Sequence, residues 1–136
     1  IQVLEQQQLR HPIETIGPIF TAEEVVAAAE AVKSVYISPI VKRYVVDLTH
    51  RTRNNNDVYL GASPRGSLGL ARAAQARAAL SGRDHVLPDD VKALAQPVLA
   101  HRIIVNPAAR LREVTAERIV QEILLTVAVP GGSFTA

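Results

Sequence analysis

Apolar side chains recur every three or four residues along most of this chain, which is the spacing of one face of a helix. The clearest stripe is formed by Ile40, Val41, Tyr44, Val45 and Leu48. Polar and charged residues fill the positions between the apolar ones, so each such stretch predicts an amphipathic helix with one buried face. The pattern predicts five helices, over residues 22–33, from Pro39 onward, over 64–80, from Pro88 onward and over 115–127.

Residues at the expected helix ends support these boundaries. Thr21 followed by Glu24 is a capping box, in which each side chain accepts a hydrogen bond from the backbone amide of the other residue. Ser38 and Ser63 each stand before a proline, and proline fits the first turn of a helix. Gly82 follows the third helix, where glycine readily adopts the left-handed conformation that ends a helix. Five helices with short connections indicate a small all-α bundle.

The longest polar segments lie outside these helices. Residues 1–10 are polar and predict a helix, but Pro12, Gly17 and Pro18 break any helix in the segment that follows. We interpret that segment as a linker. Residues 51–63 are rich in Asn and predict an exposed loop.

Two short segments carry β-branched residues. Val35–Ile37 and Ile103–Val105 each predict a short strand, and they would form a two-stranded element if they paired with one another. Pro97 lies inside the fourth helix and has no N–H to donate, so we expect this helix to kink or divide near Gln96. The predicted fold is therefore mainly helical, with at most one small β element.

The composition is that of one ordinary globular domain. The 136 residues are 48% hydrophobic and 21% charged, which is enough apolar material for a core. The absence of Cys excludes disulfides, thiolate metal sites and a cysteine nucleophile. No apolar run approaches the roughly 20 residues that cross a bilayer, and no signal peptide is evident, so we expect a cytoplasmic protein. Because the chain lacks Met and begins at Ile1, we expect it to be a piece of a longer protein.

Several familiar sites are missing from the sequence. No glycine precedes a lysine, so the phosphate-binding loop G-x-x-x-x-G-K-[ST] is absent. The histidines, which we interpret as surface or packing residues because no two lie three or four apart, are His11, His50, His85 and His101. Ser63 is followed by Pro64, so the hydrolase pattern G-x-S-x-G fails there. Asp89 and Asp90 begin the fourth helix, where its positive end accounts for both acids.

Arginine supplies most of the positive charge, with 12 of the 15 cations in a chain of net charge +2. Arg65 is the strongest candidate for a binding role, because it falls in the first turn of the third helix, where free backbone amides also attract anions. Arg72 shares its face, and the small residues Gly69 and Ala76 leave room there for a close neighbour. The alternative is that the small residues serve packing within the bundle and the arginines are solvated.

Residues 61–103, GASPRGSLGLARAAQARAALSGRDHVLPDDVKALAQPVLAHRI, closely resemble the C-terminal lid of the MoxR family of AAA+ ATPases. In that lid a Gly-Ala-Ser-Pro-Arg segment opens one helix, and a Gly-Arg-Asp-x-Val-x-Pro-x-Asp-Val-Lys-Ala-Leu segment opens the next. The resemblance extends over about residues 9–130. It implies that residues 1–20 are the end of an ATPase core with a connector, that 21–130 are the helical lid and that 131–136 are a flexible tail.

The resemblance also implies roles for particular residues. Arg65 matches the sensor 2 arginine, which reaches the terminal phosphate of ATP bound on a separate core, and Ser63 and Pro64 would approach the same nucleotide. ATP and Mg would bind the full-length protein, with no metal site in this chain, and the chain alone would be inactive. Gly66 and Gly69 depart from the family, which often has a better helix former there, and each costs roughly 0.5–1 kcal/mol inside a helix.

The resemblance further implies partners: the protein's own N-terminal core, a homo-oligomeric ring that is a hexamer in the family, and a protein with a von Willebrand A domain. Two other functions remain open. A basic helical nucleic-acid-binding module fits the pI of about 9.3, although a net charge of +2 argues against it. A protein-assembly module with a vestigial site predicts that Arg65 is buried in a salt bridge within the domain.

Overall fold

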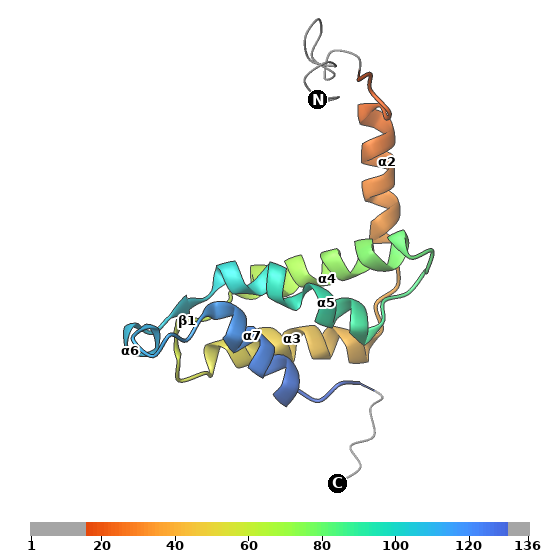
Figure 1. The fold of residues 1–136 in the computed structure, drawn as a ribbon. Coiled ribbons are helices and arrows are strands. Elements are labelled where there is room, and N and C mark those ends of the chain that lie inside the picture. Colours follow the sequence, from red (N-terminus) through yellow and green to blue (C-terminus); the bar gives the residue numbers. More distant parts are fainter. Residues whose placement is uncertain (1–15, 131–136) are drawn as a thin grey trace, which may run out of the picture. The chain divides into compact units, whose positions relative to one another are not determined.

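The computed structural model describes residues 16–130, which divide into two units, one up to Ala31 and the other from Val32 (Figure 1). The first unit contains most of helix α2 (Ala22–Lys33). Its predicted capping box is confirmed, because Glu24 N donates to Thr21 Oγ1 over 3.2 Å and Thr21 N donates to Glu24 Oε2 over 2.8 Å. No side chain of α2 is buried.

Some predictions concern residues outside this range. The polar helix expected over 1–10, the first part of the linker with His11, and the tail at 131–136 all lie outside the described residues.

The second unit is a helical bundle with a small sheet at one end (Figure 1). Its longer helices are α3 (Pro39–Arg53), α4 (Pro64–Leu80), α5 (Pro88–Leu99) and α7 (Ala116–Thr126). Helices α4 and α5 run antiparallel and pack together, while α3 contacts α4, α5 and α7. The sheet, the 3-10 helix η2 (Ala100–Arg102) and the short helix α6 (Pro107–Arg110) lie at the end opposite the α4–α5 turn.

The core lies between the longer helices. Its largest fully buried apolar side chains are Tyr44, Leu48, Leu70, Leu99 and Ile119. Burying an aliphatic or aromatic side chain of this size contributes about 1.5–3 kcal/mol each, so the apolar stripes drive the helices together. The stripe predicted on α3 is buried except at Ile40, which is exposed. The predicted fold class, mainly helical with one two-stranded element, is confirmed; among the described residues α6 is an addition.

The sequence located most helix ends correctly. Ser38 Oγ accepts a hydrogen bond from Val41 N, which confirms the predicted cap, and Thr115 Oγ1 accepts one from Arg118 N at the predicted start of the last helix. Gly82 has φ +70 and ends α4 in the left-handed conformation, as expected.

The predicted pairing of the strands is wrong. Strand β2 (Ile104–Val105) pairs antiparallel with β1 (Val58–Leu60), not with the segment 35–37. That segment is extended, but Tyr36 forms a parallel bridge with His85. The reason is topological. The antiparallel α4–α5 pair brings the chain after α5, which contains β2, back beside the chain after α3, which contains β1. Residues 35–37 lie instead beside the α4–α5 turn, at the other end of the bundle.

Two further expectations need correction. Residues 51–63 are not a single exposed loop, because α3 continues to Arg53 and β1 occupies Val58–Leu60. Helix α5 is not divided near Gln96, because it continues through Pro97 to Leu99, whereas the alternative of a kink at this point stays a prediction. A proline removes only one backbone donor, and the packing of α5 against α4 and α7 holds the helix together.

Candidate functional site

The segment that leads into α4 is held firmly against the end of α3. Ala62 is fully buried, and its N–H donates to Thr52 Oγ1 over 2.9 Å. The Thr52 hydroxyl in turn donates to the Thr49 carbonyl over 2.7 Å, so its hydrogen-bonding capacity is used on both sides. Arg53 Nε donates to the Ala62 carbonyl over 2.8 Å. Both backbone polar groups of Ala62 are therefore fixed by residues of α3.

Gly61 is required by a close backbone approach. A Cβ atom at this position would lie 2.7 Å from both Cα and N of Arg53, closer than side chains approach backbone in real proteins. Only glycine lets the two segments meet at this distance. Together with the hydrogen bonds of Ala62, this contact fixes where α4 begins.

The first turn of α4 has an unusual composition. Ser63 occupies the N-cap position with extended backbone, as predicted. Its side chain, however, makes no capping hydrogen bond. Pro64 follows at the start of the helix, as predicted, and the first turn contains no acidic residue. Its positive end is therefore not neutralised by a side chain of its own.

Arg65 is exposed in this first turn, directly after Ser63 and Pro64. Its guanidinium makes no ion pair with any residue of the described range 16–130. This exposure differs from what the protein-assembly alternative required, namely Arg65 buried in a salt bridge within the domain. The three predicted site residues thus lie together, with Arg65 available to a group outside the bundle.

The small residues of α4 serve packing within the bundle. Gly66 is buried, and a Cβ there would lie 3.2 Å from Ala62 Cβ and 3.3 Å from Leu99 Cδ2. A Cβ at Gly69 would lie 3.6 Å from Val98 Cγ1, an ordinary contact. The packing interpretation is therefore correct at Gly69, whose close neighbour is α5, while Gly66 packs against both Ala62 and α5.

A second polar cluster, at the α4–α5 turn, was not recognised from the sequence. The Asp90 carboxylate is buried and accepts two hydrogen bonds from Arg83, at 2.7 and 2.8 Å. Arg77 Nε lies 3.4 Å from Asp90 Oδ1, and Leu87 N donates to Oδ2 over 2.9 Å. The hydrogen bonds from Arg83 lower the pKa of Asp90 against the opposing effect of burial. The sequence placed Asp90 at a helix start, but nothing in the sequence indicated that Arg77 on α4 and Arg83 in the α4–α5 turn would lie against it.

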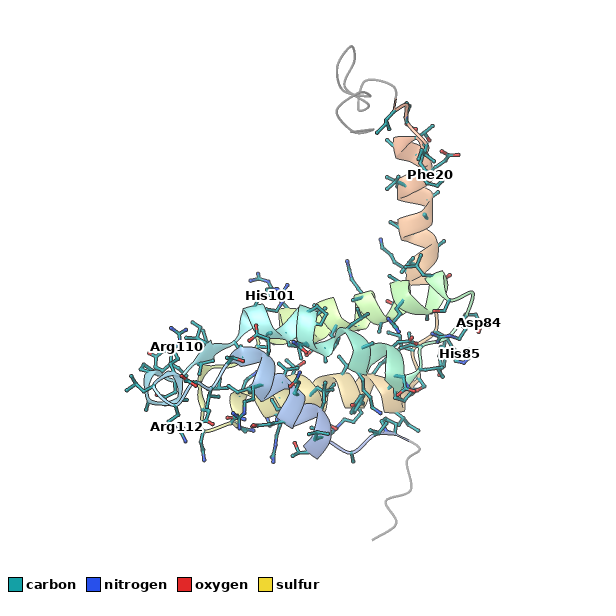
Figure 2. All side chains as sticks on the ribbon, viewed as in Figure 1. Phe20, Asp84, His85, His101, Arg110 and Arg112 are labelled. Carbon is teal, nitrogen blue, oxygen red and sulfur yellow. The ribbon has the colours of Figure 1, made fainter. Side chains whose placement is uncertain are left out.

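The histidines of the described range are all exposed. Figure 2 shows His85 beside Asp84 at the α4–α5 turn, and His101 in η2 after the end of α5. His85 Nδ1 lies 2.8 Å from Asp84 Oδ1, and this hydrogen bond lowers the pKa of Asp84. Within residues 16–130 no group of three or more His, Cys, Asp or Glu side chains is placed to hold a metal ion. Nor does any helix in that range have the length and apolar character needed to span a membrane.

Comparisons with known proteins agree with this architecture. The AAA lid domain family matches residues 50–123. The uncharacterized protein YeaC of Bacillus subtilis is 42% identical over 130 residues, covering 96% of this chain and 41% of YeaC. Protein MoxR of Paracoccus denitrificans is 38% identical over 117 residues, covering 76% of this chain and 34% of its own length. Chaperone MoxR1 of Mycobacterium tuberculosis is 40% identical over 96 residues, covering 64% of this chain and 26% of MoxR1.

A solved structure gives the same result. The crystal structure of a protein from Cytophaga hutchinsonii, which is assigned as an ATPase, superposes with a TM-score of 0.84 at 28% identity and covers 94% of this chain and 42% of that one. The chain thus spans well under half the length of these relatives.

The family model matches more than half of this chain, and the fold is a helical bundle with a two-stranded sheet. The chain therefore belongs to the AAA lid domain family and is an AAA+ lid. Its relatives identify it further as the lid of a MoxR-family AAA+ ATPase.

Proposed function

We propose that this domain closes over ATP bound to a separate ATPase core and supplies Arg65 as the sensor 2 arginine for ATP hydrolysis. The observation that carries the proposal is the placement of Arg65. It is exposed, it has no acidic partner among residues 16–130, and it stands on a segment that Thr52 and Arg53 fix to α3. The match to the AAA lid domain family supplies the context in which such an arginine faces a nucleotide.

The chemistry of Arg65 suits this role. In the transition state of transfer, negative charge is spread over the three equatorial oxygens of the terminal phosphate and develops on the leaving-group oxygen, and a fixed guanidinium stabilises that charge without reorganising. The planar guanidinium donates two parallel hydrogen bonds to one phosphate, and the free amides of the first helical turn add to its positive potential. Ser63 and Pro64 would approach the nucleotide beside Arg65, Pro64 mainly through its shape.

The remaining parts of the reaction belong to a longer protein. The phosphate-binding loop and the carboxylates that hold Mg would come from the protein's own N-terminal core, because this sequence contains no such loop. The lid would move as a rigid body when the terminal phosphate is lost, and this movement would change the packing of subunits in a homo-oligomeric ring.

The finer features of this assembly rest on the family resemblance alone. They are a hexameric ring, a cytoplasmic location, a chaperone role like the one in the name of the mycobacterial relative, and a partner protein with a von Willebrand A domain. The isolated chain would neither bind ATP tightly nor hydrolyse it.

The direct test is Arg65→Ala in the full-length protein. We expect ATP turnover at saturating ATP to fall on the order of a hundredfold, because a donor to the transition-state charge is lost. The melting temperature should hardly change, since the exposed side chain has no acidic partner among residues 16–130. Arg110→Ala is the matched control, because Arg110 is also exposed and unpaired within the described residues but lies on α6. Equal turnover in the two variants would remove Arg65 from the site.

A further inference from the structure

A second arginine approaches the first turn of α4 from the end of α5. Because the two helices run antiparallel (Figure 1), the residues that follow α5 come close to the start of α4. A Cβ atom at Gly66 would lie 3.3 Å from Leu99 Cδ2 and 3.8 Å from Arg102 Cδ. The aliphatic part of the Arg102 side chain therefore passes over Gly66, the residue next to Arg65 in the sequence.

The Arg102 side chain is held at one end and free at the other. Its Nε donates to the carbonyl of Val98 over 3.1 Å, which satisfies one of the free carbonyls at the end of α5. Its two terminal amino groups have no hydrogen-bond or ion-pair partner among residues 16–130. The backbone that follows is also fixed, because Ile103 is buried and Ile104–Val105 form β2. Arg102 is thus exposed, yet attached to a rigid part of the fold.

The positive charges at this corner are not neutralised by acidic side chains of the described residues. Arg65 and Arg102 bring two positive charges to the positive end of α4, where helices favour anions. The contrast with α5 is direct, since Asp89 and Asp90 occupy its first turn. No acidic side chain within residues 16–130 pairs with either arginine. An anion from outside the bundle would be attracted to both side chains.

We propose that Arg102 is a second binding residue for the phosphate chain of the nucleotide that Arg65 contacts. This inference rests on the proposed function, because it takes the nucleotide to lie at the start of α4. The two terminal amino groups of Arg102 present parallel donors that suit phosphate oxygens. Arg65 acts on the terminal phosphate during hydrolysis, whereas Arg102 contributes to holding ATP before the reaction.

The test compares two readouts in the full-length protein. Arg102→Ala should weaken the affinity for a non-hydrolysable ATP analogue roughly tenfold, as expected for the loss of one charge-assisted contact. It should raise KM for ATP more than it lowers kcat. Arg102→Gln keeps a long side chain over Gly66 without the charge and should show the same loss of affinity. Arg110→Ala again serves as the control and should bind the analogue like the unaltered protein.

The outcomes separate this inference from the proposed function. If Arg65→Ala loses turnover while Arg102→Gln binds the analogue as tightly as Arg110→Ala, the assignment of Arg102 is wrong and the role of Arg65 stands. If Arg65→Ala keeps full turnover, the proposed function fails first. If Arg102→Ala unfolds the lid, the affinity of the Arg102→Gln protein for the analogue is the test. A folded Arg102→Gln protein with unchanged KM and unchanged analogue affinity would overturn the inference, leaving the bond to Val98 as the role of Arg102.

Discussion

Arginines at the two ends of the α4–α5 pair have different surroundings. At the end where α4 turns into α5, Arg77 and Arg83 share the buried carboxylate of Asp90. At the opposite end, Arg65 and Arg102 have no acidic partner within residues 16–130. In Figure 2 the labels of Asp84 and His85 mark the first end, and those of His101 and Arg110 mark the second.

This difference separates two uses of the same side chain. A buried carboxylate with guanidinium partners is costly to break, so the paired end serves the stability of the bundle. An exposed guanidinium at a helix N-terminus contributes little to folding and is available to an anion. We therefore expect substitutions at the paired end to change stability, and substitutions at the unpaired end to change nucleotide chemistry.

The largest expected effect on stability is at the paired end. Asp90→Asn removes the charge that Arg83 and Arg77 surround, and it should lower the free energy of unfolding of the 136-residue chain by about 3 kcal/mol. Urea unfolding measures this directly. The matched control is Asp89→Asn, because Asp89 is adjacent and highly exposed, and its ion pair with Lys92 lies at the surface. The control should change stability by less than about 0.5 kcal/mol. Equal effects in the two variants would contradict the distinction between the ends.

A substitution at Gly61, where the segment before α4 is held against α3, should affect both stability and ATP turnover. Gly61→Ala places a Cβ 2.7 Å from the backbone of Arg53, so the segment that carries Arg65 must shift. We expect a loss of about 2 kcal/mol in stability, together with reduced ATP turnover in the full-length protein. Gly69→Ala is the control, since its Cβ would meet only Val98 at 3.6 Å. It should stabilise α4 by about 0.5–1 kcal/mol. A Gly61→Ala protein with full stability would show that the close approach is not required.

The pH dependence of stability should also reside at the paired end. The pKa of Asp90 is lowered in the fold, first by its hydrogen bonds from Arg83, so its contribution is complete above the ordinary aspartate value of about 3.9. The contribution disappears as the pH falls through the lower folded pKa. The stability difference between the unaltered chain and Asp90→Asn should therefore shrink in acid below about pH 4. Asp84, whose pKa is also lowered, is present in both proteins and cancels. A difference that is constant from pH 7 to pH 2 would contradict this assignment.

Much of the fold followed from local signals. The caps at Thr21, Ser38 and Thr115 and the glycine at position 82 each act on the nearest turn of backbone, so sequence spacing was sufficient to locate them. The position of Arg65 in a first helical turn was predictable for the same reason, because Pro64 precedes it.

The features that were missed depend on contacts between distant residues. Strand β1 is only three residues long, within an Asn-rich stretch, and its partner β2 comes after α4, α5 and η2. Asp90 was expected to be explained by the helix dipole, but its burial depends on how α4 packs against α5. The anchoring of Ala62 by Thr52 and Arg53 likewise requires the turn between α3 and α4 to close first. None of these arrangements produces a periodic pattern in the sequence.

In our proposal the start of α4 approaches the terminal phosphate of ATP. An ATP analogue with a photoreactive group on its terminal phosphate, bound to the full-length protein and activated by light, tests this most directly when the labelled peptides are mapped by mass spectrometry. We expect label on the peptide that contains Ser63, Pro64 and Arg65, and we expect this label to be lost when excess ATP competes. Label confined to other parts of the protein, with none on residues 61–66, would show that the start of α4 does not approach the terminal phosphate.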